Sequence, residues 1–237
     1  MIEIEGVPSS EAIRAELAAE GRPVLLAFSC GKDALASWLA LRDSGVTDIR
    51  AVYLYYVPGL RFVEESLGRF ERVFGCRIAR YPHPSLYRWL ANRVFQPPER
   101  LAILEAAQMP SPSYEQIWDV IREDFGVDRE CLVADGVRAA DSIVRRASIK
   151  RYGALKRKGR KVSVVWDWQK AEVLDRIRAA KIDLPVDYEW FGRSFDGVDR
   201  RFLEPLSRHA PDDYQRVLDW LPLAEIELFR HELGGVA

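Results

Sequence analysis

The sequence predicts an α/β protein built on a mainly parallel five-stranded sheet flanked by helices. Short apolar runs of the kind that form buried strands alternate along the chain with segments of helical spacing. Strands that alternate with helices join into parallel sheets through right-handed crossovers. Such sheets bind ligands beyond the carboxyl ends of their strands, so we expect the functional site in the loops that follow strands.

Composition narrows the classes of function. The 237 residues are 48% hydrophobic and 30% charged, as in ordinary globular proteins. With 35 basic and 36 acidic residues the net charge is −1, which predicts no overall attraction to nucleic acid or membranes. The three cysteines form no C-x-x-C pair, so we expect no disulfide framework and no iron–sulfur cluster. The acidic N-terminus and the short apolar runs predict a cytoplasmic protein.

The N-terminal third shows the alternation most clearly. Ser9 can cap a first helix that ends at Gly21, and a continuous apolar run follows, as expected of a strand buried on both faces. A Val- and Tyr-rich run predicts the second strand. The expected elements are, in order, a helix over 9–20, a strand over 24–28, a helix over 34–42, a strand over 49–57, a helix over 62–74 and a strand over 77–81.

The pattern changes after the third strand. Six prolines among amphipathic pieces predict a helical insertion over 82–125. We therefore expect one α/β domain over 1–200 that carries this insertion, and a helical C-terminal extension over 201–237 packed on it. The remaining expected elements are strands over 131–134 and 162–165 and a helix over 168–180.

A turn suited to phosphate follows the first strand. In Ser29-Cys30-Gly31-Lys32-Asp33, backbone N–H groups and the dipole of the next helix favour a bound anion. Gly31 permits a close approach, the Ser29 hydroxyl can donate, and Lys32 can reach phosphate oxygens. Asp33 can cap the helix or help to hold Mg²⁺. The alternative is a tight turn that is capped by Ser29 or Asp33 and leaves Lys32 in solvent.

A second phosphate-friendly turn follows the fourth strand. Gly136 again permits a close approach, while Arg138 and Arg145 offer two-pronged forks to phosphate or sulfate oxygens. Asp141 can hold one of these arginines, and Ser142 can cap the helix that follows. A strand end with Gly and Arg is common, so this segment alone also fits an ordinary turn.

Together the two segments resemble the motifs of the PP-loop ATP pyrophosphatases, an adenine nucleotide alpha-hydrolase-like superfamily. The first is similar to the S-G-G-x-D-S loop, from which Cys30 and Ala34 depart. The second, D-G-V-R-A-A-D-S-I-V-R over 135–145, is similar to the G-x-R-x-x-[ED]-S-x-x-R signature of the branch that holds PAPS reductases and DndC-like proteins. A weaker likeness runs over 166–194, and the resemblance covers roughly 20–200.

The resemblance implies a HUP-type, Rossmann-like fold and an enzyme that uses ATP and Mg²⁺. Such an enzyme cleaves ATP at the α-phosphate, adenylates an acceptor and releases pyrophosphate. The resemblance implies catalytic roles for Lys32, Asp33, Arg138 and Arg145, with Asp33 as the metal ligand. The acceptor would be a nucleic acid or a small oxyanion such as sulfate, and the resemblance allows a homodimer. The implied nucleotide-binding residues are Ser29, Cys30, Gly31, Lys32, Ala34, Gly136, Val137, Asp141 and Ser142.

Two alternative functions stay open. One is a sulfonucleotide (PAPS) reductase that draws its thiol from a partner or from Cys30. The family's reductases use a C-terminal cysteine, whereas this chain has no cysteine after Cys131. The other alternative is a nucleotide-binding module without catalysis, which the substitutions Cys30 and Ala34 would allow.

A basic segment adjoins the second motif. Between residues 145 and 161 the chain has nine basic residues and no acidic one. This segment can hold the nucleotide's phosphates or a polyanion such as tRNA or DNA, and the alternative is a solvated helix face. The residues of the expected polyanion patch are Arg146, Lys150, Arg151, Lys156, Arg157 and Lys158.

Overall fold

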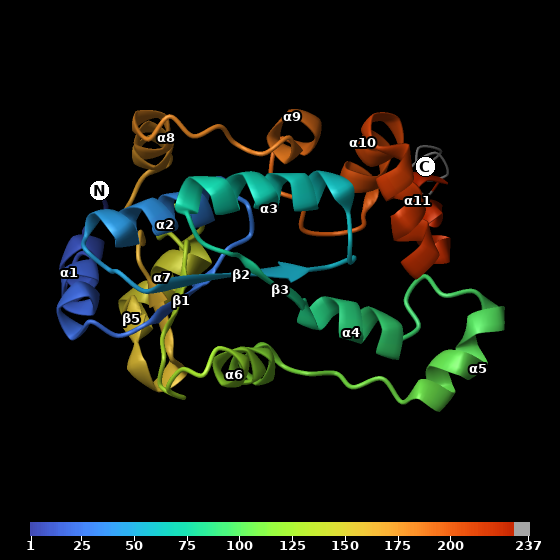
Figure 1. Cartoon of the computed structure of the whole chain (residues 1–237), viewed down its shortest axis with the longest axis horizontal. Helices are drawn as coiled ribbons and strands as arrows, with labels where there is room; N and C mark the ends of the chain where they lie inside the picture. The colour runs from blue at the N-terminus through green and yellow to red at the C-terminus, as the bar shows by residue number, and fades with distance from the viewer. Residues whose placement is uncertain (230–237) are drawn as a thin grey trace. The chain divides into compact units, whose positions relative to one another are not determined.

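The computed structural model describes residues 1–229 and confirms an α/β fold with a mostly parallel sheet (Figure 1). The strands are β1 (Val24–Ala27), β2 (Ile49–Tyr55), β3 (Ala79–Pro82), β4 (Val133–Asp135), β5 (Leu155–Lys156) and β6 (Lys161–Ser163). The first helices are α1 (Ser10–Glu20), α2 (Lys32–Asp43), α3 (Arg61–Phe74), α4 (Pro84–Ala91), α5 (Pro98–Ala107) and α6 (Tyr114–Asp124). The later helices are α7 (Ile143–Tyr152), η1 (Arg157–Gly159), α8 (Lys170–Ala179), α9 (Asp187–Phe191), α10 (Arg200–His209), α11 (Pro211–Trp220) and η2 (Pro222–Glu225).

The sheet has six strands in the order β3-β2-β1-β4-β6-β5. Strand β1 runs parallel to β2 and to β4, and β4 runs parallel to β6. The expected count of five strands is wrong, because β5 pairs antiparallel with β6 at the edge of the sheet. Strand β5 is only two residues long and lies in the basic segment, so it leaves no apolar run in the sequence.

The strand order contains a topological switch point between β1 and β4. The chain passes from β1 to β2 and β3 on one side, and then adds β4 on the other side of β1. At such a point the loops that follow the two strands leave in opposite directions and open a crevice at the carboxyl edge. In this chain those two loops are the two motif segments.

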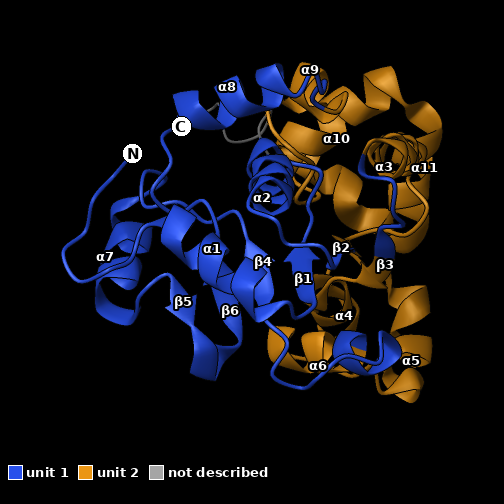
Figure 2. Cartoon of the chain, turned by 60° about the vertical axis from the view of Figure 1, so that its left-hand side comes forward, with its two compact units in different colours: residues 1–53, 74–79, 121–184 blue, residues 54–73, 80–120, 185–237 orange. Residues whose placement is uncertain are grey.

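The chain divides into two compact units (Figure 2). Unit 1 consists of residues 1–53, 74–79 and 121–184, and unit 2 of residues 54–73, 80–120 and 185–237. Both motif segments belong to unit 1. The boundary that the sequence predicts near residue 200 stays a prediction.

Helix α2 is the centre of the unit 1 core. It packs against β1, β4, α1 and α8, and every residue over 34–41 is buried. The ring of Trp38 stacks on Phe74, with centroids 3.8 Å apart, and Arg42 covers the ring of Trp38. A helix buried on all sides is held firmly, so the loop at its N-terminus is held in place as well.

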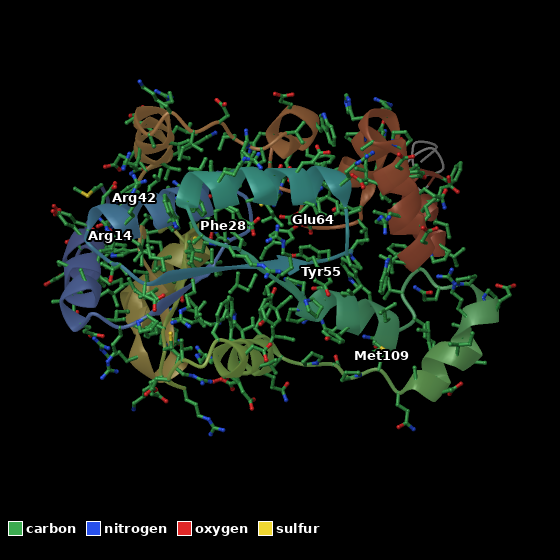
Figure 3. The ribbon with its side chains drawn as sticks, viewed as in Figure 1. Arg14, Phe28, Arg42, Tyr55, Glu64 and Met109 are labelled. Carbon is green, nitrogen blue, oxygen red and sulfur yellow. The ribbon has the colours of Figure 1, made fainter. Side chains whose placement is uncertain are left out.

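A buried network ties α1 to the segment that follows β6. Arg14, labelled in Figure 3, donates to the carbonyl oxygen of Val164 at 2.6 Å and to the hydroxyl of Ser10 at 2.8 Å. Ser10 donates through its hydroxyl and its backbone N–H to the carboxylate of Asp167. Burial lowers the pKa of Arg14, and the nearby Asp167 charge opposes that shift.

Unit 2 contains helices α4, α5 and α6 of the predicted helical insertion up to residue 120, followed by the C-terminal helices. Asp213 on α11 accepts the backbone N–H groups of Arg61 and Phe62 at the start of α3. The rings of Phe62, Phe195 and the fully buried Phe202 pack edge to face near these helices. The expected helical extension over 201–237 reaches beyond the described residues.

Candidate anion site at the switch point

The first loop leaves the start of α2 without a side-chain cap. Phe28 still pairs with the sheet through its N–H, which donates to Val52 at 2.8 Å, and Ser29 follows as an exposed residue. Gly31, rather than Ser29 or Asp33, is the N-cap residue, and its backbone is extended at φ −77° and ψ 161°. Helix α2 therefore begins without a side-chain hydrogen bond from its N-cap residue, and uncapped N–H groups at a helix start suit an anion.

Cys30 occupies a strained position in this loop. Its φ is +59°, in the left-handed region that favours glycine, and its side chain is buried. A non-glycine residue there costs on the order of 1–2 kcal/mol. The departure from the resembled motif thus falls on a loop residue whose backbone prefers glycine. Ala34, the other departure, is buried in α2.

The second loop touches the backbone of the first turn of α2. A Cβ added to Gly136 would lie 2.7 Å from the carbonyl carbon of Asp33 and 2.8 Å from its oxygen. Real side chains do not approach backbone so closely, so only glycine fits. Residue Val137 continues the turn, and its N–H donates to the carboxylate of Asp135 at 3.1 Å.

A chain of alternating charges joins the two loops. Lys32 Nζ lies 2.5 Å from Asp33 Oδ2, and Asp33 Oδ1 lies 2.9 Å from Arg138 Nε, although without the alignment of a hydrogen bond. Arg138 Nη2 also pairs with Asp141 at 2.6 Å, and Arg145 pairs with the other oxygen of Asp141 at 2.5 Å. Three cations face two carboxylates, so this group of five side chains has a net positive charge that an anion would neutralise.

The members of this chain differ in exposure. The side chain of Arg138 is 4% exposed, whereas that of Arg145 is 49% exposed. Arg138 is therefore fixed by Asp33 and Asp141, while Arg145 can turn toward a ligand. Ser142 caps α7, because its hydroxyl accepts the N–H of Arg145 at 3.1 Å.

The structure adds two polar residues that sequence reasoning did not single out. Burial raises the pKa of Asp135, which also forms a side-chain hydrogen bond with Ser163. Ser37 donates to the carbonyl oxygen of Asp33 at 2.8 Å and thereby stabilises the first turn of α2. The position of Asp135 at the end of β4, directly before Gly136, was a signal that could have revealed it.

Asp33 does not fit the metal ligand that the resemblance implies. Its two carboxylate oxygens face Lys32 and Arg138, so a cation would have to compete with both. Within residues 1–229, no cluster of three or more His, Cys, Asp or Glu side chains could hold a metal ion.

The basic segment separates into paired and unpaired residues. Arg157 forms ion pairs with Glu16 and Glu20 on α1, which neutralise it. Lys156 reaches the hydroxyl of Ser148 at 3.5 Å, and Lys158 is exposed. The exposed cations of α7 for which the described residues record no ion pair are Arg146, Lys150 and Arg151.

The weaker likeness over 166–194 falls on residues with structural tasks. Trp166 is buried and donates its ring N–H to the carbonyl oxygen of Pro8. Glu172 and Gln169 form a capping box at the start of α8. Arg193 in unit 2 pairs with Asp196.

In residues 1–229 no helix has the length and apolar character of a membrane span.

The chain matches no protein-family model and no curated protein sequence. Among solved structures it is similar to an NH3-dependent NAD synthetase from Campylobacter jejuni subsp. jejuni in complex with the nitrate ion. The two sequences are 13% identical, the match covers 94% of this chain and 97% of the other, and the TM-score is 0.43. Similarity at this level is too low to transfer an activity, so a function for this chain has to rest on its own residues.

Proposed function

We propose that unit 1 contains an adenine-nucleotide site of the PP-loop type, at which ATP is cleaved between its α- and β-phosphates. The observation that supports the proposal is the backbone contact of Gly136 with Asp33, which brings an uncapped helix start and three cations together at the switch point. Anions prefer helix N-termini, and nucleotides prefer switch points of parallel sheets.

Each residue has a role in this proposal. The N–H groups at the start of α2 and the Ser29 hydroxyl would hold phosphate oxygens. Lys32 would break its ion pair with Asp33 and pair with these oxygens instead. Asp33 would keep Arg138 in place. Arg145, which is half exposed, would turn from Asp141 toward the phosphates. Mg²⁺ would arrive on the phosphates of ATP.

The reaction is a displacement at the α-phosphorus. An oxygen of the acceptor attacks that phosphorus, and the bond to the oxygen that bridges the α- and β-phosphates breaks. That oxygen leaves with the electron pair as pyrophosphate, and the acceptor carries the AMP group. The protein supplies positioning and positive charge, and these effects account for most of the catalysis in phosphoryl transfer. The acceptor is proposed to be a small oxyanion or a nucleic acid.

The alternative of a reductase with an internal thiol finds little support. Cys30 is buried, and burial raises the pKa of Cys131, which disfavours its thiolate. A sulfonucleotide reductase of the PAPS-reductase branch that takes its thiol from a partner stays a second candidate. A nucleotide-binding module without catalysis is the third.

Incubation with α-labelled ATP and Mg²⁺ tests the proposal, with sulfate, tRNA or DNA added in turn. We expect labelled AMP or an adenylated acceptor together with pyrophosphate. Lys32→Ala should abolish turnover, whereas Lys170→Ala, which removes an exposed lysine at the start of α8, should not. Saturable ATP binding without turnover under every condition would contradict the enzyme proposal, and sulfite release from PAPS with thioredoxin would favour the reductase.

A further inference from the structure

Helix α7 exposes aliphatic side chains that the proposed nucleotide site does not use. Ile143 is 87% exposed and Val144 is 78% exposed, whereas Ile149 is the buried apolar residue of this helix. Isolated exposed apolar residues are ordinary on protein surfaces. Two in succession beside unpaired cations form a patch, and patches of this kind mark interaction sites.

Helical periodicity gathers these side chains on one face. Residues three and four apart lie on the same side of a helix, so Ala147 lies one turn beyond both Ile143 and Val144. The basic residues that border these three follow the same spacing. The α7 face is defined as Ile143, Val144, Arg146, Ala147, Lys150 and Arg151.

The charge of the α7 face is not balanced locally. Residues 142–166 include no acidic side chain, and Asp141 is already engaged by Arg138 and Arg145. Within residues 1–229, Arg146, Lys150 and Arg151 of the α7 face form no ion pair. The face therefore combines an aliphatic centre with uncompensated positive charge.

We propose that the α7 face binds an acidic amphipathic helix of a partner protein. Acidic side chains of that helix would pair with Arg146, Lys150 and Arg151, and its apolar stripe would cover Ile143 and Val144. A second copy of α7 would bring like charges together, which disfavours a symmetric contact through this face. A nucleic acid would satisfy the cations and leave the aliphatic pair against phosphates. This proposal goes beyond the nucleotide site and does not depend on it.

Fluorescence anisotropy with labelled peptides and the full chain tests the proposal. The probe is a designed helix of about 18 residues, with Leu at i, i+3, i+4 and i+7 and Glu on both sides of that stripe. A scrambled peptide of the same composition keeps the charge and removes the stripe. We expect the amphipathic peptide to bind at least about tenfold more tightly than the scrambled one, and to weaken as salt rises from about 50 to 300 mM.

Two variants separate the contributions of the α7 face. Ile143→Ser with Val144→Ser removes the apolar centre, and Arg146→Glu with Lys150→Glu and Arg151→Glu reverses the charge. We expect each to weaken peptide binding about tenfold or more, a loss of about 1.4 kcal/mol. Ile103→Ser on α5, where the native side chain is 70% exposed, is the matched control and should leave binding unchanged. Unchanged thermal midpoints would show that the variants fold.

Three outcomes would overturn the proposal. Equal binding of the scrambled peptide would show that charge alone acts. Oligonucleotide binding that is lost on charge reversal, together with peptide binding that is unaffected by the serine variants, would assign the face to nucleic acid. A dimer in sedimentation that the serine variants dissociate would assign it to a second copy of this chain.

Discussion

Gly136 and Asp33 are in contact through their backbones, and this contact sets the distance between the two loops of the candidate site. A Cβ at Gly136 would lie 2.7 Å from the carbonyl carbon of Asp33. The same two segments are linked a second time, through Arg138 and the carboxylate of Asp33. A substitution in one loop should therefore also displace the other loop.

Gly136→Ala should damage stability and binding together. Because the added methyl group meets backbone rather than a flexible side chain, the loops must separate, at a cost of about 1–3 kcal/mol. Urea unfolding and titration with a fluorescent ATP analogue measure the two effects. Gly68→Ala on α3 is the control. Its new Cβ would find only the end of Arg72 at 3.8 Å, so we expect a gain of about 0.5–1 kcal/mol and unchanged binding. Tight ATP binding by Gly136→Ala would argue against the proposed site.

Arg138→Met should be among the most destabilising single changes in unit 1. It leaves Asp33 and Asp141 facing each other without their shared cation, and breaking a buried ion pair costs about 3–5 kcal/mol. Both carboxylates are partly exposed, so we expect the lower end of that range. Arg138→Lys keeps the charge but loses the fork that spans both carboxylates, and its urea midpoint should fall between those of wild type and Arg138→Met. Equal midpoints for both variants would refute this role of the guanidinium.

Cys30→Gly should leave the chain as stable as the wild type or up to about 1 kcal/mol more stable. Glycine relieves the strain at φ +59°, and its greater freedom in the unfolded chain offsets part of that gain. Cys30→Val places a β-branched side chain in the same backbone conformation and should lower the thermal midpoint. If valine proved more stable than glycine here, the left-handed backbone at Cys30 would be in question.

Unit 2 should lose stability in acid through His83. Its ring Nδ1 accepts the N–H of Ser85 at the start of α4, and burial lowers its pKa from 6.5 to about 4. The unfolded chain then takes up the proton first, so the stabilisation is complete above about pH 6.5 and is lost as the pH falls toward 4. His83→Asn keeps an acceptor for Ser85 and does not titrate. Urea midpoints at several pH values should show a smaller decline for this variant, and an unchanged slope would exclude His83 as the cause.

Much of the fold could be predicted because buried parallel strands leave continuous apolar runs, as β1 does. Strand β5 could not be predicted, since its pairing with β6 is decided by tertiary contacts rather than by its own two residues. The positions of Ser29 to Asp33, between β1 and the first turn of α2, and of Gly136 follow from strand ends. Sequence could not show that Asp33 would be shared between Lys32 and Arg138, because this depends on the separation of two segments that are distant in the chain.

The pairing of β1 with β4 also has a consequence for how the protein folds. Leu25 pairs with Val133, so about one hundred residues must be enclosed before the two loops meet. Contacts between such distant residues form slowly, because closing a long loop costs entropy before the pairing returns any stabilisation. A chain still emerging from the ribosome therefore has the first loop long before it has a site. During refolding, the chain should therefore become able to bind ATP only in the last kinetic phase of unit 1, when both loops are in place.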